Sequence, residues 1–387
     1  MNELHYRIAF VTGYNLRFGG GGERVILELV SRLPIDTFEA AIVQTDHIDR
    51  ERIDDEEIKA KCNNAELITI RGYFHKFDFL SKSSGLNLIK TVVIFPLLKA
   101  LSAIRNRKLM ATISNFDAVY LIDNNLDTLF RKKCTLLIGS AHGEFFYTDG
   151  IIPKLQMRLV KDRIFRRAID GFHLFPTYKP ISEALGRKFN FILPNGTNPK
   201  LNLARNEQDE QDEKMKFLFV GRLEEYKGVI TLVEAWKELI PYECELHIVG
   251  VGPLQGWIEE NNVDGLYFHG LVNASELLNI TKLCDVFIYP TKRDAFPLVI
   301  IDALSCGLYV ITSDVLAGRF DDFLERGFLK YVIPETKLLE VAITEALKNK
   351  NELRLKRRVI AEYTRDNYNW DAIASKFFDT MKKFLET

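Results

Sequence analysis

The sequence contains few cysteines and no paired cysteine motif. Five of its 387 residues are cysteine, and no two of them form a CxxC pair. Disulfide-stabilised domains and zinc sites depend on paired cysteines, so we expect neither here. Scattered cysteines are typical of a reducing compartment, and we therefore expect a cytoplasmic protein. The five are Cys62, Cys134, Cys244, Cys284 and Cys306.

The sequence also lacks an excess of either charge. It has 52 basic and 53 acidic residues, for a net charge of −1. A nucleic-acid-binding protein usually carries a basic surface, so no nucleic-acid partner is expected. Hydrophobic residues make up 47% and charged residues 27%, as in a soluble globular protein. At this length, we expect two domains.

Long hydrophobic runs are missing as well. The N-terminal residues enter a predicted strand almost at once, without a signal-peptide pattern. The most apolar segment, residues 86–103, is interrupted by Lys90, Pro96 and Lys99, which leaves eight uncharged residues in a row. A helix needs about 20 apolar residues to span a bilayer. The segment is therefore predicted to form buried or interfacial helices.

Short β-branched runs alternate with longer helical segments along the whole chain. This alternation predicts βαβ units with parallel sheets, and most of the runs are apolar throughout, as strands buried on both faces should be. The predicted strands are 7–13, 38–45, 65–70, 118–123, 134–142, 171–177 and 190–196 in the first half, and 216–221, 245–250, 266–270, 285–290, 309–314 and 330–334 in the second.

A polar segment separates the two series of strands. Residues 203–216, "LARNEQDEQDEKMK", are rich in acids, and the turn-forming "LPNGTNP" precedes them. We therefore predict two doubly wound α/β domains that face a cleft, followed by an amphipathic helix that packs back on the first domain. The predicted bounds are 1–196, 197–365 and 366–387. Ligands bind such sheets beyond the carboxyl ends of the strands, so the residues that follow the strands are the candidates for a site.

Four glycines, residues 19–22, follow the first strand and open a predicted helix. Glycine allows backbone amides to approach an anion closely, and the helix N-terminus favours negative charge. The spacing fits neither the GxGxxG nor the Walker pattern, so it supports no standard dinucleotide or P-loop site. A flexible turn is the alternative interpretation.

Polar residues and glycines also follow several other strands. Arg222 and Lys227 could converge on a diphosphate, or they could simply be solvated. Gly250 and Gly252 would permit a base or ribose to approach the backbone. His142 ends the strand at 134–142, where it could contact a ligand or serve the fold alone.

The stretch "RDAFPLVIIDALSCG" follows the strand at 285–290. Pro297 is suited to a first helical turn, so a helix is predicted over 297–306, ending before Gly307. Asp294 then precedes the helix and Asp302 lies within it. The two acids could face a ligand. Alternatively, Asp294 complements the helix dipole and Asp302 pairs with a lysine.

Five of these motifs, in this order, resemble one known family. "GGGGERV", "PNGTN", "GRLEEYKG", "VGVGPL" and "RDAFPLVIIDALSCGLYVITSD" resemble GGxER, PNG(V/I)D, GRLxxxKG, GxGP and the E-x7-E block. These are the motifs of the retaining GT-B glycosyltransferases of family 4, also called glycosyl transferases group 1. The resemblance spans both halves of the chain, and each motif falls at the end of a predicted strand.

The resemblance implies a role for each matching residue. Arg222 and Lys227 would bind the diphosphate of the donor, Asp302 its ribose and Asp294 its sugar. His142 would lie near the transferred sugar, which makes Arg222, Lys227, Asp294 and His142 the implied catalytic residues. Further donor contacts would come from the backbone at Gly21, Gly22, Gly252, Phe296, Pro297, Leu298 and Val299.

The implied reaction is transfer of a hexosyl group from a UDP- or GDP-linked sugar to an acceptor hydroxyl, with retention of configuration. The acceptor would be a glycan or a lipid-linked saccharide. Neither a metal nor a further cofactor is implied, and no DxD motif stands at a strand end. Both acids of the block are Asp where the family usually has Glu, so a catalytically silent subunit that binds a nucleotide sugar or a partner protein remains the alternative.

Residues 153–167, "PKLQMRLVKDRIFRR", form a basic segment with a single acid, Asp162. A basic amphipathic helix can lie on anionic lipid, which would place the protein at the cytoplasmic face of the membrane. An ordinary surface helix with one apolar face explains the same pattern.

Overall fold

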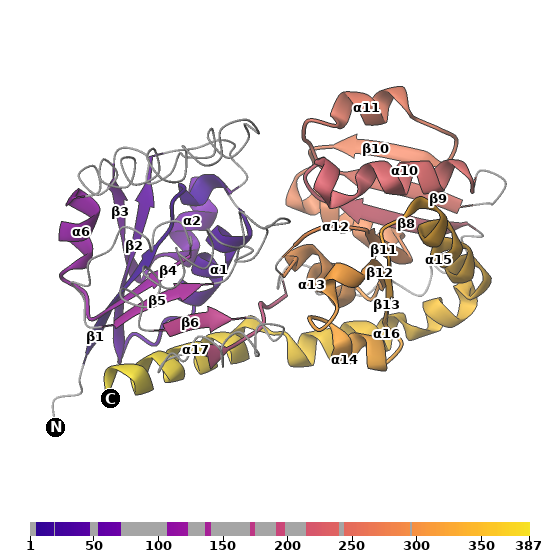
Figure 1. Ribbon diagram of the computed structural model, residues 1–387. Coiled ribbons are helices and arrows are strands. Elements are labelled where there is room, and N and C mark those ends of the chain that lie inside the picture. Colours follow the sequence, from indigo (N-terminus) through magenta and orange to yellow (C-terminus); the bar gives the residue numbers. More distant parts are fainter. Residues whose placement is uncertain are drawn as a thin grey trace, which may run out of the picture. The chain divides into compact units, whose positions relative to one another are not determined.

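The computed structural model describes residues 5–18, 20–46, 53–70, 107–122, 136–140, 171–174, 191–197, 214–239, 244–294 and 296–387. The chain forms two compact units. Unit 1 comprises Met1–Pro194 together with Asp371–Thr387, and unit 2 comprises Asn195–Trp370. The chain therefore leaves unit 1 after Pro194 and returns to it at Asp371 (Figure 1).

Unit 1 is built on a seven-stranded sheet in the order β3-β2-β1-β4-β5-β6-β7, and each strand pairs in parallel with its neighbours. Its strands are β1 (Tyr6–Val11), β2 (Phe38–Thr45), β3 (Ala65–Ile70), β4 (Ala118–Leu121), β5 (Leu136–Ser140), β6 (Gly171–Leu174) and β7 (Phe191–Ile192). Its described helices are η1 (Leu16–Phe18), α1 (Gly21–Val30), α2 (Asp55–Lys61), α6 (Arg107–Ile113) and α17 (Trp370–Leu385).

The C-terminal helix α17 completes the core of unit 1. Phe377 is fully buried, and its ring lies 6.1 Å from that of Phe10 on β1 and 5.1 Å from that of Tyr120 on β4. Phe378 contacts Phe38 on β2 at 5.4 Å. Figure 1 shows α17, in yellow, lying along this sheet. The apolar face that the sequence predicts for this tail is thus buried against strands more than 250 residues away in the chain.

Unit 2 is built on a six-stranded parallel sheet in the order β10-β9-β8-β11-β12-β13. Its strands are β8 (Met215–Val220), β9 (Cys244–Val249), β10 (Leu266–Gly270), β11 (Val286–Tyr289), β12 (Tyr309–Ser313) and β13 (Leu329–Val332). Its described helices are η8 (Glu225–Lys227), α10 (Val229–Lys237), α11 (Gln255–Glu260), α12 (Ala274–Leu283), α13 (Leu298–Ser305), η9 (Asp314–Leu316), α14 (Asp321–Glu325), α15 (Thr336–Lys348) and α16 (Lys350–Asn367).

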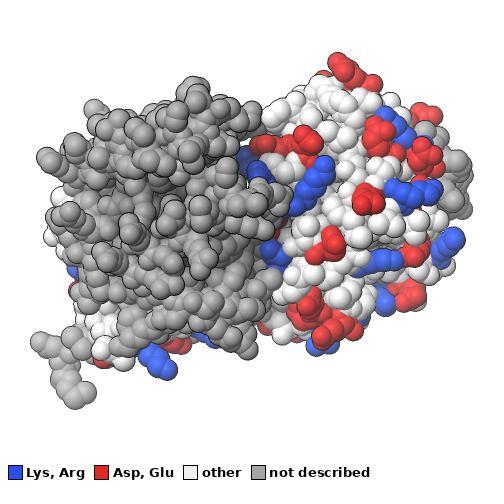
Figure 2. Space-filling model, in the orientation of Figure 1, with Lys and Arg blue, Asp and Glu red and all other residues white. Residues whose placement is uncertain are grey.

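Apolar and ionic contacts attach the helices to this sheet. Trp236 of α10 packs edge-on against Phe217 of β8, with ring centroids 5.5 Å apart. Asp285, just before β11, is buried and accepts hydrogen bonds from Arg354 and Arg357 of α16. In the view of Figure 2, acidic and basic side chains are interspersed over the surface of unit 2.

The structure confirms the predicted fold class, and all thirteen predicted strands overlap an observed one. The strand predicted at 190–196 is wrong at its end, since β7 stops at Ile192. Pro194 has no N–H to donate to a sheet. Beyond it, Thr197 donates its backbone N–H to Tyr368 instead of to a strand. The helix predicted over 297–306 is observed as α13, with Pro297 as its N-cap and Gly307 in the left-handed region.

Several predictions concern residues outside the described part of the chain. They are the apolar segment 86–103, the basic segment 153–167, most of the acidic segment 203–216 and His142. Among the helices that the structure does describe, none combines the length and hydrophobicity that crossing a bilayer requires.

Candidate functional site

Each sheet has a point where the strand order reverses, between β1 and β4 in unit 1 and between β8 and β11 in unit 2. Ligands of open parallel sheets bind at the carboxyl ends of the strands beside such a point. Arg222 and Lys227 follow β8, and Asp294 follows β11. The structure therefore brings these three predicted residues to the switch point of unit 2.

Lys227 and Asp294 meet directly at this point. The Lys227 ammonium donates to Asp294 Oδ2 at 2.5 Å and to the Tyr289 hydroxyl at 2.7 Å. The Tyr289 hydroxyl in turn donates to Asp294 Oδ2 at 2.8 Å. The Lys227 side chain is 13% exposed and that of Asp294 is 19% exposed. The three polar atoms thus form a closed, largely desolvated triangle, and Tyr289 is a member that the sequence did not point to.

Two tyrosines surround the Lys227 ammonium with aromatic surface. It lies 5.1 Å from the ring centroid of Tyr226 and 5.3 Å from that of Tyr289. Burial raises the pKa of Tyr289 well above its usual value, and the Asp294 carboxylate raises it further. Burial also raises the pKa of Tyr226, although Arg222 opposes the shift. Both hydroxyls therefore stay protonated at neutral pH, and each can donate as well as accept.

Arg222 and Arg293 lie around the same Tyr226 ring. The Arg222 guanidinium donates to Glu224 at 2.9 Å and to the Tyr226 hydroxyl, and its side chain is 49% exposed. The Arg293 guanidinium lies 4.4 Å from the centroid of the Tyr226 ring. Three cations thus gather around one aromatic residue, an arrangement suited to an anionic ligand.

The loops that carry these residues are bonded to each other. The backbone oxygen of Tyr226 accepts from the Lys292 N–H at 2.7 Å and from the Thr291 hydroxyl at 3.1 Å. Gly228, at φ 78°, ends the first loop, and a Cβ there would lie 1.9 Å from the Pro290 carbonyl oxygen. Only glycine allows the two loops to approach this closely.

The glycines after β9 have a similar packing role. Gly250 has φ 140°, and a Cβ there would lie 1.8 Å from the backbone oxygen of Gly221. A Cβ on Gly252 would lie 2.5 Å from the backbone oxygen of Leu223. Close packing between the β8 and β9 loops thus accounts for both glycines. The contact of Gly252 with a donor stays a prediction.

Helix α13 presents the remaining predicted residues. Phe296 and Pro297 are buried, whereas Leu298, Val299 and Asp302 are half-buried. Burial raises the pKa of the Cys306 thiol to about 12, and the nearby Asp302 carboxylate adds to the shift. Asp294, to which the alternative interpretation assigned a helix-dipole role, forms an ion pair with Lys227.

In unit 1, the predicted glycines also lie at a switch point. Gly20 is the N-cap of α1, which begins at Gly21. A Cβ on Gly22 would lie 2.5 Å from the side chain of Ile122, the residue after β4. Glu23 in the first turn is buried and accepts a 2.8 Å hydrogen bond from the Thr12 hydroxyl. Glu23 is not among the predicted site residues, although it stands in the stretch "GGGGERV" that follows the first strand.

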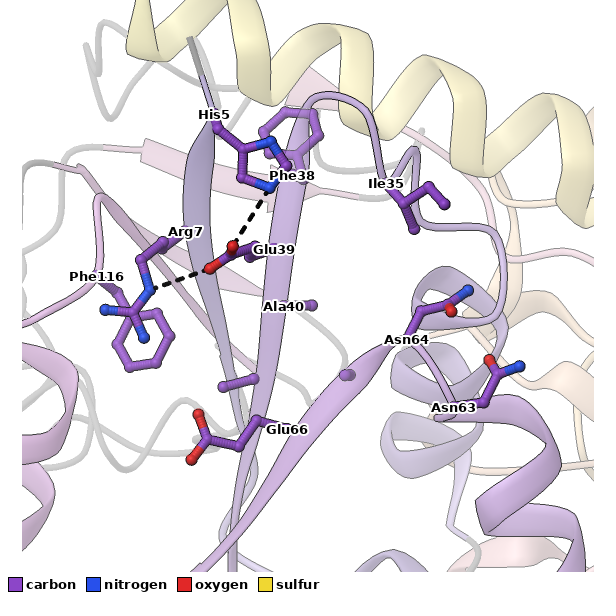
Figure 3. Close-up of a pocket in the computed structure, with 12 residues that line it drawn as sticks. His5, Arg7, Ile35, Phe38, Glu39, Ala40, Asn63, Asn64, Glu66 and Phe116 are labelled. Atoms are coloured by element: carbon purple, nitrogen blue, oxygen red, sulfur yellow. Dashed lines mark ion pairs between the residues drawn. The ribbon is translucent and has the colours of Figure 1, made fainter.

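A separate hollow of about 560 Å³ lies at the opposite edge of the unit 1 sheet. It is lined at the amino ends of β1 to β3 by His5, Arg7, Glu39 and Glu66, among others. Figure 3 shows His5 and Arg7 directed at Glu39, with ion-pair distances of 3.6 and 3.5 Å. The Glu39 side chain is 62% exposed. This hollow, which Ile35, Phe38 and Phe116 also line, lies at the amino ends of the strands, whereas ligands of such sheets bind at the carboxyl ends.

The described part of the chain contains no cluster of three or more His, Cys, Asp or Glu residues arranged to hold a metal ion. The candidate site in unit 2 combines the cations Arg222, Lys227 and Arg293 with tyrosine hydroxyls and the carboxylates of Glu224 and Asp294, and its three cations suit a negatively charged ligand.

Comparison with known proteins shows that the chain is similar to glycosyltransferases. Residues 202–367 match the family model described as glycosyl transferases group 1. An uncharacterized glycosyltransferase of Methanocaldococcus jannaschii, MJ1069, is 24% identical over 66% of this chain and 69% of its own length. The lipopolysaccharide 1,2-N-acetylglucosaminetransferase of Salmonella typhimurium is 23% identical over 50% of this chain and 57% of its own. A second M. jannaschii protein, MJ1607, is 30% identical, but the match spans only 36% of its length.

Solved structures resemble the chain over nearly its whole length. The sucrose-phosphate synthase of Thermosynechococcus elongatus has a TM-score of 0.72 and 17% identity over 98% of this chain and 99% of its own. Anabaena HepE in complex with UDP-glucose has a TM-score of 0.67 and 15% identity over 98% of this chain and 100% of its own. At these identities the likeness concerns the fold. The chain therefore has the GT-B glycosyltransferase fold, and its residues 202–367 match the glycosyl transferases group 1 family.

Proposed function

We propose that the protein is a glycosyltransferase that moves a hexosyl group from a nucleotide-diphosphate sugar to an acceptor hydroxyl, with retention of configuration. The observation that carries the proposal is the convergence of Arg222, Lys227 and Asp294 at the β8/β11 switch point, within the residues that match the family model. The structures of HepE with UDP and with UDP-glucose support a nucleotide-sugar donor.

In this proposal, the cations act on the leaving group. When the bond between the sugar and the diphosphate breaks, its electron pair stays on the phosphate oxygen, where negative charge develops. Lys227 and Arg222 stabilise that charge, and the low exposure of Lys227 strengthens its contribution. Two cations in place make a metal ion unnecessary for this step, and no further cofactor is required.

The other predicted residues bind the rest of the donor. Asp302 contacts the ribose, and Asp294 contacts the donor sugar. The backbone at Gly21, Gly22, Gly252, Phe296, Pro297, Leu298 and Val299 supplies further contacts to sugar, phosphate and nucleoside, and His142 acts near the transferred sugar. The half-buried surface of Leu298, Val299 and Asp302 on α13 is consistent with these contacts.

We propose a glycan or lipid-linked saccharide as the acceptor. Relatives named for such acceptors include the gpi3 subunit of the Schizosaccharomyces pombe phosphatidylinositol N-acetylglucosaminyltransferase, at 23% identity. Another is an Escherichia coli galactosyltransferase that acts on GlcNAc-diphosphoundecaprenol, at 30% identity. Peripheral contact of residues 153–167 with an anionic membrane would bring the protein to such an acceptor.

The donor assignment is tested by incubating the protein with UDP-, GDP- and ADP-linked hexoses and measuring nucleoside diphosphate release, with and without EDTA. We expect release with one donor, unaffected by EDTA. Arg222→Ala and Lys227→Ala should each lower turnover by roughly 10²–10³-fold while the thermal melt is retained, as for the loss of one oxyanion donor. Absence of both release and a thermal shift with every donor would favour the silent nucleotide-sugar-binding subunit.

The membrane assignment is tested by flotation with vesicles that contain phosphatidylglycerol. We expect the wild-type protein to float with these vesicles at low salt and to be released as salt rises. A variant with Lys161, Arg163, Arg166 and Arg167 changed to Gln should stay in the bottom fraction. Equal flotation of the two proteins would remove the support for membrane contact through residues 153–167.

A further inference from the structure

Tyr289 joins the two sides of the switch point. It is the last residue of β11, and its side chain is almost fully buried, at 2% exposure. Its hydroxyl reaches Lys227, which follows β8, at 2.7 Å, and Asp294, which follows β11, at 2.8 Å. The hydroxyl is thus held by the sheet, whereas both of its partners come from loops.

Lysine has a long flexible stem and a freely rotating ammonium, so its position in a site must be set by other groups. The Lys227 ammonium has three N–H groups, one of which goes to Tyr289 and one to Asp294. The rings of Tyr226 and Tyr289 flank it at 5.1 and 5.3 Å. The third N–H therefore has its direction set before any ligand arrives.

Asp294 alone would hold the Lys227 ammonium in a way that weakens its binding to an anionic ligand. A lone carboxylate draws the ammonium onto itself and competes with any anionic ligand for its charge. The Tyr289 hydroxyl is a neutral acceptor, so it orients the ammonium without cancelling its charge. It also donates its own proton to Asp294 Oδ2 and thereby takes up part of that oxygen's capacity to bind Lys227.

We propose that Tyr289 is a positioning residue that directs the Lys227 ammonium at a phosphate oxygen of a bound nucleoside diphosphate. This inference rests on the proposed function, since it takes the ligand of Lys227 to be a nucleotide diphosphate. It concerns a residue within an apolar strand, "DVFIYP", which the family motifs quoted above do not contain.

The test is Tyr289→Phe, measured by calorimetric titration with UDP, GDP and ADP and by donor and acceptor kinetics. Phenylalanine keeps the ring, which packs 6.0 Å from both Phe219 and Phe287, and removes only the hydroxyl. We expect roughly tenfold weaker binding of the preferred nucleotide, as for the loss of a hydrogen bond to a charged group. The KM for the donor should rise and the KM for the acceptor should stay unchanged.

Tyr331→Phe is the matched control. It removes a tyrosine hydroxyl that bonds to an aspartate, Asp321, at 3.1 Å in the same unit but away from Lys227. It should leave nucleotide affinity and both KM values unchanged. If the two variants lose stability and affinity to the same extent, the role of Tyr289 is merely structural and the inference is wrong.

A double-mutant cycle shows whether Tyr289 acts through Lys227. Lys227→Met should weaken nucleotide binding, and adding Tyr289→Phe to it should cause no further loss. A further tenfold loss in the Lys227→Met background would overturn the positioning role, as would wild-type affinity in the Tyr289→Phe variant. If the wild-type protein binds none of the three nucleotides, or if Lys227→Met binds them normally, the proposed function itself fails.

Discussion

The tyrosines around Lys227 have no feature in the sequence that marks them as site residues. Tyr289 lies in an apolar strand and would be assigned to the core, and Tyr226 lies in a polar loop. The contact of Tyr289 with Lys227 depends on β8 and β11 being neighbours, although 65 residues or more separate the two strands, whereas Tyr226 directly precedes Lys227 in the chain. At the scale of single residues, local patterns indicate the cations but not the groups that orient them.

Gly228 provides a test at this scale. Gly228→Ala would force a Cβ to within 1.9 Å of the Pro290 oxygen at a φ of 78°. We expect unit 2 to lose at least about 2 kcal/mol of stability, since the left-handed conformation alone costs about 1–2 kcal/mol. Nucleotide binding should weaken in parallel, because the loop carries Lys227.

All three tryptophans, Trp236, Trp257 and Trp370, lie in unit 2, so tryptophan fluorescence during urea unfolding measures this loss. Gly256→Ala is the control, because a Cβ there meets nothing within 4 Å and Gly256 lies within α11. It should stabilise unit 2 by about 0.5–1 kcal/mol. Equal stabilities for the two alanine variants would contradict the packing role assigned to Gly228.

At the scale of elements, one buried ion cluster ties α16 to the sheet. The Asp285 side chain is 1% exposed, and those of Arg354 and Arg357 are each 11% exposed. Asp285 Oδ2 also accepts from the Lys216 N–H at the start of β8. One carboxylate thus joins β8, β11 and α16 at the amino edge of the sheet, opposite the candidate site.

Asp285→Ala should destabilise unit 2 by about 3–5 kcal/mol, because it leaves two guanidinium groups buried without their carboxylate. The tryptophan fluorescence transition should move to clearly lower urea. Glu362→Ala is the control, since it breaks the exposed pair with Arg358 on the same helix. An exposed pair contributes at most about 1 kcal/mol, so comparable losses in the two variants would show that the Asp285 cluster is not a stabilising contact.

At the scale of the whole molecule, the chain crosses between its two units twice. Trp370 is the last residue of unit 2. The residues after it belong to unit 1, where the apolar face of α17 packs on the sheet. Within unit 2, a Cβ on Gly196 would lie 2.7 Å from the Trp370 ring, so glycine allows these two residues to pack closely. The C-terminal helix therefore packs into the unit that contains the N-terminal residues.

Phe377→Ala tests this arrangement. The ring is fully buried against β1 and β4, so unit 1 should lose about 3–5 kcal/mol. Amide hydrogen exchange in Tyr6–Val11 and Ala118–Leu121 should accelerate, while the tryptophan transition of unit 2 stays in place. Lys376→Ala, at an exposed position one residue earlier, should change neither. Faster exchange confined to unit 2 would contradict the assignment of α17 to unit 1.

The sequence by itself determined which segments form strands, where α13 begins, and which residues follow the strands of both sheets. These features depend on local patterns: apolar runs, the fixed φ of Pro297 and the glycines at helix ends. Only the tertiary structure decided that Tyr289 and Asp294 hold Lys227 and that Asp285 binds two arginines. The physical reason is that a hydrogen-bond partner is chosen by strand order and register, which bring together residues with no local relation in the chain.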